Sequence, residues 1–222
     1  MSKKRDDKEF TNNYYNPLTA KTEKQKQLFN ALATYEIIIA YGAAGTGKTA
    51  CVVSKACEDL YNKKIEKIVI SRPAKESGET LGHLPGEIDQ KFDPYLAPIR
   101  CIMNDILGKS TIDYNLKSGN IEVVPLAYCR GRTFNNSFII LDEAQNSTPE
   151  QMKMFLTRIG HNSKMTINGD NSQVDIRGPN GLDDAIRRHR WIPSLAIVEF
   201  DRKDIVRNSI ISDILSGYDN YS

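Results

Sequence analysis

Apolar residues in this chain come in short runs, each followed by a polar or glycine-rich segment. Residues 37–41 and 68–70 are rich in β-branched side chains without alternation, which is typical of buried parallel strands. Between these runs, residues 49–60 predict a helix. Another predicted helix begins at Thr22 and has Gln25, Leu28, Phe29 and Leu32 on one face. This order predicts an α/β fold with helices on both faces of a parallel sheet.

The second half of the chain continues this organisation. Thr148 and Gln151 form a capping-box pattern with a proline between them, so we expect a helix that begins at Thr148 and ends at Gly160. Residues 112–124, interrupted by a polar segment at 117–120, predict a β-hairpin. We also expect strands at 138–141, 165–168 and 195–200, and a C-terminal helix at about 204–216.

A segment rich in proline and glycine lies between Arg72 and Pro98. It contains Pro73, Gly78, Gly82, Pro85, Gly86, Pro94 and Pro98. Loops of this length are usually functional, so we expect a lid-like loop here.

Composition is that of an ordinary globular protein. The 222 residues are 40% hydrophobic and 26% charged, and a net charge of +2 favours no particular partner. No apolar run approaches the ~20 residues of a membrane-spanning helix, and the polar start resembles no secretory signal. We therefore expect a cytoplasmic protein without a membrane partner, with residues 1–20 as a flexible polar arm and residues 21–222 as one domain.

Residues 42–49 read GAAGTGKT and fit the pattern G-x4-G-K-[ST] between a predicted strand and a predicted helix. Such glycines let backbone N–H groups surround a phosphate, and the helix N-terminus adds positive potential. We expect Lys48 to reach the β- and γ-phosphates and the Thr49 hydroxyl to bind Mg²⁺. The predicted nucleotide-binding residues are Gln25, Gly42, Ala43, Ala44, Gly45, Thr46, Gly47, Lys48, Thr49 and Ala50.

An acid pair, Asp142 and Glu143, follows the predicted strand at 138–141. Parallel sheets bind ligands at the carboxyl ends of their strands. We expect Asp142 to hold Mg²⁺ through water and Glu143 to orient and deprotonate the attacking water. The sequence therefore predicts nucleotide hydrolysis, with the acid strand lying alongside the strand of the glycine-rich loop.

The choice of base rests on weaker signals. Guanine-specific proteins of this kind use N-K-x-D, and the nearest string, residues 62–65, lacks the aspartate, which favours adenine. Gln25 is the candidate reader of adenine because it lies on the apolar face of its helix, whereas Gln27 points the opposite way. The alternative is that Gln25 is a buried amide satisfied by backbone groups.

Several longer strings closely resemble the PhoH family. They are YGAAGTGKT at 41–49, SRPA at 71–74, GETLGHLPG at 78–86, DPYL at 93–96, PLAYCRGRT at 125–133, LDEAQN at 141–146, TPEQMKMFLTRIG at 148–160 and GDxxQ at 169–173. The resemblance implies a RecA-like P-loop ATPase, related to the first motor domain of superfamily 1 helicases and linked to RNA. Short members like this one resemble those carried by bacteriophages, which would place it in the host cytoplasm.

The resemblance also assigns roles that spacing alone leaves open. It implies that Gln173 senses the γ-phosphate and lies beside Asp142, whereas without the family residues 170–173 would be an ordinary turn. An arginine finger accelerates phosphoryl transfer by about 10³–10⁵. We favour Arg207 as this finger, because it projects from the apolar stripe of the predicted last helix. The alternative is that Arg207 belongs to a partly buried ion pair. Other candidates for this role or for nucleic-acid contacts are Arg72, Arg130, Arg132 and Arg158.

Helicases close their ATP between two such domains, and one is predicted here. We therefore expect a homo-oligomeric ring, with a hexamer favoured, whose ATP sites lie at subunit boundaries. For RNA or single-stranded DNA, the loop at 72–98 and the segment at 130–132 are the favoured contacts. The basic cluster at 187–190 is interpreted as a helix C-terminus, with Trp191 covering the core.

Two other functions remain as alternatives. An ATP-switched regulatory or assembly module would use the same site without moving along nucleic acid. A nucleoside kinase is a minor alternative because thymidine kinases also combine a P-loop with Asp-Glu-Ala-Gln. Those kinases carry C-x-x-C pairs for zinc, and the four cysteines here form none.

Overall fold

The computed structural model describes residues 14–73 and 88–206 of the chain, with the side chains of residues 88–95 excepted. Within this part, six strands form one sheet in the order β3-β2-β4-β5-β1-β6, and every pairing is parallel. The strands are β1 (Ile37–Gly42), β2 (Lys67–Ser71), β3 (Ile121–Val123), β4 (Ser137–Leu141), β5 (Lys164–Gly169) and β6 (Leu195–Phe200). The predicted parallel α/β architecture is confirmed.

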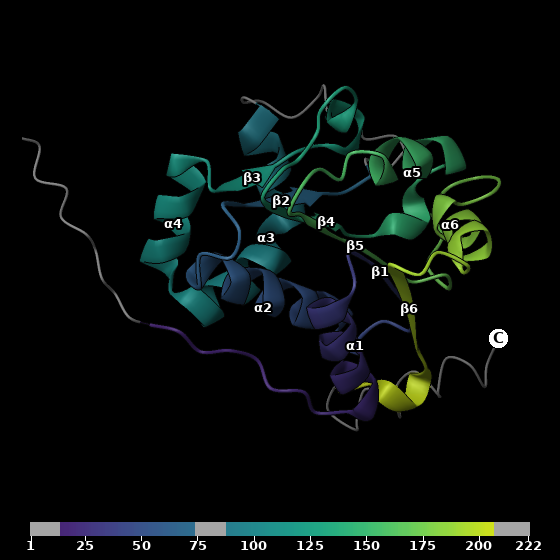
Figure 1. The fold of residues 1–222 in the computed structure, drawn as a ribbon, viewed down its shortest axis with the longest axis horizontal. Helices are drawn as coiled ribbons and strands as arrows, with labels where there is room; N and C mark the ends of the chain where they lie inside the picture. Colours follow the sequence, from purple (N-terminus) through teal and green to yellow (C-terminus); the bar gives the residue numbers. More distant parts are fainter. Residues whose placement is uncertain (1–13, 74–87, 207–222) are drawn as a thin grey trace, which may run out of the picture.

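Helices cover both faces of the sheet (Figure 1). One face carries α1 (Glu23–Thr34), α2 (Lys48–Tyr61), α3 (Ile88–Leu107) and α4 (Lys109–Ser118), and the other carries α5 (Pro149–Leu156) and α6 (Gly181–His189). Short 3-10 helices occur at η2 (Leu126–Cys129), η3 (Ala144–Asn146) and η4 (Arg202–Asp204). Among the described helices, none has the length and apolarity needed to cross a membrane.

Each central strand contributes to two hydrophobic cores. In β4, Phe138 and Ile140 pack beneath α1–α4, whereas Ile139 and Leu141 pack beneath α5 and α6. This division follows from the alternation of side chains along a strand. All five residues of β4 are buried, so the carboxyl end of this strand is held from both sides. The acid pair therefore follows one of the most firmly packed strands.

The predicted helix starts are confirmed at both capping sites. Thr22 caps α1, and its hydroxyl accepts a hydrogen bond from the Gln25 backbone N–H at 3.2 Å. Thr148 and Gln151 form the predicted capping box of α5, with Pro149 at the first helical position. These caps satisfy N–H groups that would otherwise lack partners.

The predicted hairpin at 112–124 is wrong. Residues 109–118 form α4, and only the short β3 follows, which pairs in parallel with β2. Ile112 is fully buried and Leu116 packs against the same core one helical turn later, so the apolar residues follow a helical spacing. Gly119, with φ +78°, then ends the helix.

The predicted loop at 72–98 is wrong at its end, because residues 88–98 belong to α3. Pro94 and Pro98 lie inside this helix although proline removes a hydrogen bond there. The next turns bury Ile99, Met103 and Leu107 against the sheet. Tertiary packing has therefore outweighed local helix-breaking tendency in this segment.

The predicted end of α5 at Gly160 is also wrong, because the helix stops at Leu156. Gly160 instead meets the segment before β4, where its N–H donates to the Phe134 carbonyl at 2.9 Å. A Cβ at this position would lie 2.6 Å from the same carbonyl oxygen, so close backbone approach explains the glycine.

The two ends of the described chain can be compared with the predicted N-terminal arm and the predicted C-terminal helix. From the segment assigned to the flexible arm, residues 14–20 lie against the domain, with Tyr15 stacked on Tyr61 at 4.7 Å and the Leu18 N–H donating to the Ser54 hydroxyl. At the other end, η4 ends at Asp204 and residues 205–206 are not helical. Most of the predicted helix at 204–216, including Arg207, lies outside the described residues.

Candidate functional site

The glycine-rich loop joins β1 to α2 and is shaped by close backbone packing. Gly42, Gly45 and Gly47 all have positive φ angles, which side chains disfavour. At Gly42, a Cβ would also lie 2.0 Å from the Phe200 carbonyl oxygen on β6. The neighbouring strand therefore requires glycine where the loop begins.

Lys48 lies at the N-terminus of α2, and its amine is enclosed by the loop. The Nζ donates to the Gly42 and Ala43 carbonyls at 2.7 Å each, and the residue is 8% exposed. Burial lowers the pKa of Lys48, while the negative charges of Asp170 and Asp142 act in the opposite direction. The ammonium group is thus held at the centre of the loop.

Thr49, in the first turn of α2, and Asp142, just after β4, meet although β1 and β4 are not neighbouring strands. The Thr49 hydroxyl donates to Asp142 Oδ1 at 3.0 Å. The expectation that the acid strand lies alongside β1 is wrong, because β5 lies between β1 and β4. The first turn of α2 reaches across this gap, so the loop and the acid pair still face each other.

Asp142 is a buried carboxyl group, 9% exposed. Burial raises its pKa, and the adjacent charge of Glu143 raises it further, whereas Arg72 and the Thr49 hydroxyl lower it. A carboxylate in this position is therefore costly unless a cation joins it.

Glu143 is held at both carboxylate oxygens. Its Oε1 lies 3.0 Å from the guanidinium of Arg72, and its Oε2 accepts from the Gln145 amide at 2.7 Å. The backbone of Glu143 is left-handed, with φ +54°, an unusual conformation for this residue type. Together these restraints fix the direction in which the carboxylate points.

The end of β5 supplies the third part of the site. β5 pairs with β4, so Asp170 and Gln173 lie beside the acid pair as expected. A cavity of about 330 Å³ lies between these three parts, and its lining includes Gly47, Lys48, Thr49, Arg72, Asp142, Glu143, Asp170 and Gln173. Gln173 is exposed, so this side of the cavity is open to solvent.

Gln25 supports the loop from behind. Its Nε2 donates to the Thr46 carbonyl at 2.9 Å, and its Oε1 accepts from the Lys21 backbone N–H at 2.7 Å. The amide is thus bonded to backbone groups, as the alternative interpretation expects, and recognition of adenine stays a prediction. Thr46 is buried in the loop, whereas Ala44, Gly45 and Ala50 line the cavity.

The candidate arginines are spread over the molecule. Of those described, only Arg72 lines the cavity. Arg132 pairs with Glu122 at 2.8 Å, and Arg158 donates to the Met154 and Arg132 carbonyls. Arg130 is exposed.

The basic cluster at 187–190 lies at the C-terminus of a helix, as the sequence predicts. α6 ends at His189, and Arg187 and Arg188 both pair with Asp184 on the same helix. The expectation that Trp191 covers the core is wrong, because this side chain is 78% exposed.

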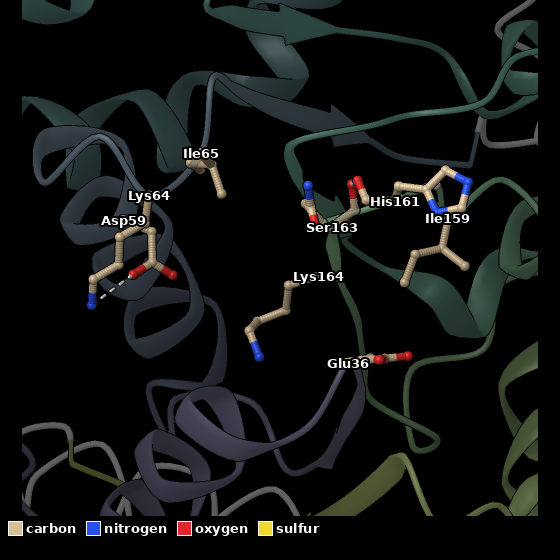
Figure 2. Close-up of a pocket in the computed structure, with 10 residues that line it drawn as sticks. Glu36, Asp59, Lys64, Ile65, Ile159, His161, Ser163 and Lys164 are labelled. Carbon is tan, nitrogen blue, oxygen red and sulfur yellow. Dashed lines mark hydrogen bonds and ion pairs between the residues drawn. The ribbon is translucent and has the colours of Figure 1, made fainter.

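A larger cavity, about 510 Å³, lies at the opposite edge of the sheet, where β1 and β5 begin (Figure 2). Three of its charged groups have partners: Asp59 is 2.9 Å from Lys55 and 3.9 Å from Lys64, and Lys164 donates to the Tyr35 carbonyl. Across the described ranges, no three His, Cys, Asp or Glu side chains are grouped to hold a metal. We assign this cavity no chemistry.

One buried residue of the site has no role assigned from the sequence. Gln145 belongs to the Asp-Glu-Ala-Gln string, but nothing in the local pattern shows what its side chain contacts. The structure buries it completely between the acid pair and the end of β5. The sequence signal that could have identified Gln145 is the presence of a polar residue two positions after the acid pair.

A glycine-rich loop entering a helix, with its threonine bonded to an acid from a parallel strand, defines a P-loop nucleotide-binding domain. Residues 17–219 match the family described as PhoH-like protein, and the chain belongs to this family. It is 44% identical to the PhoH-like protein of Bacillus subtilis, covering 91% of this chain and 64% of that protein. It is 42% identical to protein PhoH of Escherichia coli, covering 91% of this chain and 58% of that protein.

The chain thus spans about three-fifths of the length of these two relatives. Among solved structures, the large terminase from the thermophilic bacteriophage D6E matches with a TM-score of 0.51 and 13% identity, covering 89% of this chain and 50% of that protein. At this identity the match shows a shared fold.

We predict that Asp142→Asn stabilises the protein without ligand. Because the pKa of Asp142 is raised in the folded state, the free energy of unfolding falls as pH rises from the unfolded to the folded pKa. Asparagine removes this loss and keeps an oxygen for Thr49, so urea unfolding at pH 7 should show a higher free energy of unfolding than wild type. Asp105→Asn, at an exposed position, is the control and should change little. Equal stability of Asp142→Asn and wild type would contradict the prediction.

Proposed function

We propose that this chain binds ATP with Mg²⁺ and hydrolyses it. The observation that carries the proposal is the hydrogen bond between Thr49 and Asp142, which joins the phosphate loop to the acid pair. Hydroxyl and carboxylate oxygens are the donors that Mg²⁺ prefers, and a cation would offset the burial of Asp142. The donor set therefore fits the metal, which when bound neutralises phosphate charge.

The remaining side chains have distinct roles in this proposal. Lys48 would bind the β- and γ-phosphates, and Glu143 would orient the attacking water and accept its proton. Gln173 would contact the γ-phosphate from the end of β5. Gln25, on α1, would read adenine, and its Nε2 would have to do so beside the bond it donates to the Thr46 carbonyl.

We predict that Glu143→Gln separates binding from hydrolysis. The amide keeps the shape of the side chain but cannot accept a proton, so kcat should fall by about 10²–10⁴ while nucleotide affinity stays within a few-fold. The measurement is phosphate release together with titration of a fluorescent ATP analogue. Lys48→Ala should lose affinity as well, because it removes phosphate contacts. Hydrolysis unchanged in Glu143→Gln would exclude Glu143 as the base.

We propose further that hydrolysis is coupled to RNA or single-stranded DNA. In the segment after β3, Tyr128 is 59% exposed and Arg130 is exposed, so an aromatic ring and a cation two residues apart in the chain both reach the surface. This pairing suits base stacking and phosphate contact. The alternative is an ATP-switched module that binds no strand, and it uses the same nucleotide site.

We predict that polyuridylate or oligo(dT) raises the hydrolysis rate several-fold. Added salt should weaken the effect because phosphate contacts release counterions. The double change Tyr128→Ala with Arg130→Ala should abolish the stimulation and keep the basal rate. Trp191→Ala is the matched control at another exposed aromatic beside basic residues. Identical rates with and without polymer at all salt concentrations would favour the ATP-switched module.

A homo-oligomeric ring, with a hexamer favoured, is our proposal for the assembly. The open side of the cavity at Gln173 supports it, because a neighbouring subunit could exclude water there and supply an arginine. The bacterial origin of the relatives supports action in a bacterial cytoplasm. Origin from a bacteriophage stays a prediction.

We predict that two inactive variants restore activity when mixed. Lys48→Ala subunits would keep their arginine, and Arg207→Ala subunits would keep their phosphate loop, so mixed rings contain complete sites. Hydrolysis is measured across mixing ratios, with the mass in solution measured in parallel. No recovery at any ratio would contradict a shared site.

A further inference from the structure

Gln145 uses one buried amide to connect three groups of the site. Its side chain is 0% exposed and lies in η3, between the ends of β4 and β5. The Nε2 donates to Glu143 Oε2 at 2.7 Å and to the Gln173 carbonyl at 3.2 Å, and the Oε1 accepts from the Asp170 N–H at 3.0 Å. Both donor hydrogens and the acceptor are therefore used.

The space for this amide depends on Gly169, the last residue of β5. A Cβ at Gly169 would lie 2.9 Å from the Gln145 Oε1 and 3.2 Å from its backbone nitrogen. β5 therefore approaches η3 closely enough for the Asp170 N–H to reach the amide. Glutamine has the length and the donor–acceptor pair that this gap requires.

The contacts fix Glu143 from the side opposite to Arg72. Arg72 holds Oε1 and the Gln145 amide holds Oε2, so the carboxylate can rotate only by breaking one of these contacts. The same amide holds the backbone of Gln173. A displacement of the segment at 170–173 is thereby passed to Glu143 through a single buried group.

We propose that Gln145 is a positioning residue that couples the orientation of Glu143 to the segment carrying Gln173. It does not touch the nucleotide: it aligns the base and links that alignment to the end of β5. The inference rests on the proposed hydrolysis and assigns a role to a residue that local sequence patterns leave without one.

The test compares two variants of Gln145 with matched variants of Gln27, which is exposed on α1. Gln145→Met keeps the length and removes all three hydrogen bonds. Gln145→Glu keeps an oxygen for Asp170 but removes the donor and places a second carboxyl group beside Glu143. The controls are Gln27→Met and Gln27→Glu. Steady-state kinetics, affinity for a non-hydrolysable ATP analogue and melting temperature are measured for the full chain.

We expect both Gln145 variants to lose about ten- to a hundred-fold in kcat, with KM and analogue affinity within about three-fold of wild type. A fall in kcat with KM, analogue affinity and melting temperature unchanged is a split that a merely structural defect would not cause. If Gln145→Met fails to fold, Gln145→Glu alone decides the test.

The outcomes separate this inference from the proposed function. If wild type hydrolyses ATP and the Gln145 variants match the Gln27 controls, Gln145 has no positioning role and the proposed function stands. If kcat and analogue affinity fall together, the positioning role is overturned. If wild type hydrolyses no nucleotide, the proposed function fails and this inference fails with it.

Discussion

The hydrogen bond between Thr49 and Asp142 is the contact on which the site depends. It joins the first turn of α2 to the carboxyl end of β4, 93 residues along the chain and with β5 lying between β1 and β4. The contact can form only if three parallel strands end at the same edge in the correct register. The two hydrophobic cores hold that register, because the central strands are buried on both faces.

The same contact places charge where burial opposes it. Burial raises the pKa of Asp142 and lowers that of Lys48, so both groups are less readily charged than in water. A phosphate near Lys48 and a cation near Asp142 would each lower the free-energy cost of keeping these buried groups charged. Stability lost at the site is offset by packing elsewhere, which is the usual relation between active-site strain and stability.

Local patterns in the sequence predicted most of the sheet and its helix starts. Strands such as β1 and β4 are short β-branched runs, and the caps at Thr22 and Thr148 depend on groups within three residues. The failures have two causes. The extension of α3 across Pro94 and Pro98 and the early end of α5 depend on packing against other elements. The helix over residues 109–118 was missed although its apolar residues have a helical spacing.

The sequence by itself determined the phosphate loop, the acid pair, the parallel sheet and the family, because each can be recognised from short contiguous segments of the chain. Only the tertiary structure decided what their side chains contact. It put β5 between the two functional strands, gave Gln145 its three partners and left Trp191 exposed. The physical reason is range: backbone conformation follows from neighbours a few residues away, whereas the partners of a buried amide come from segments that packing brings together.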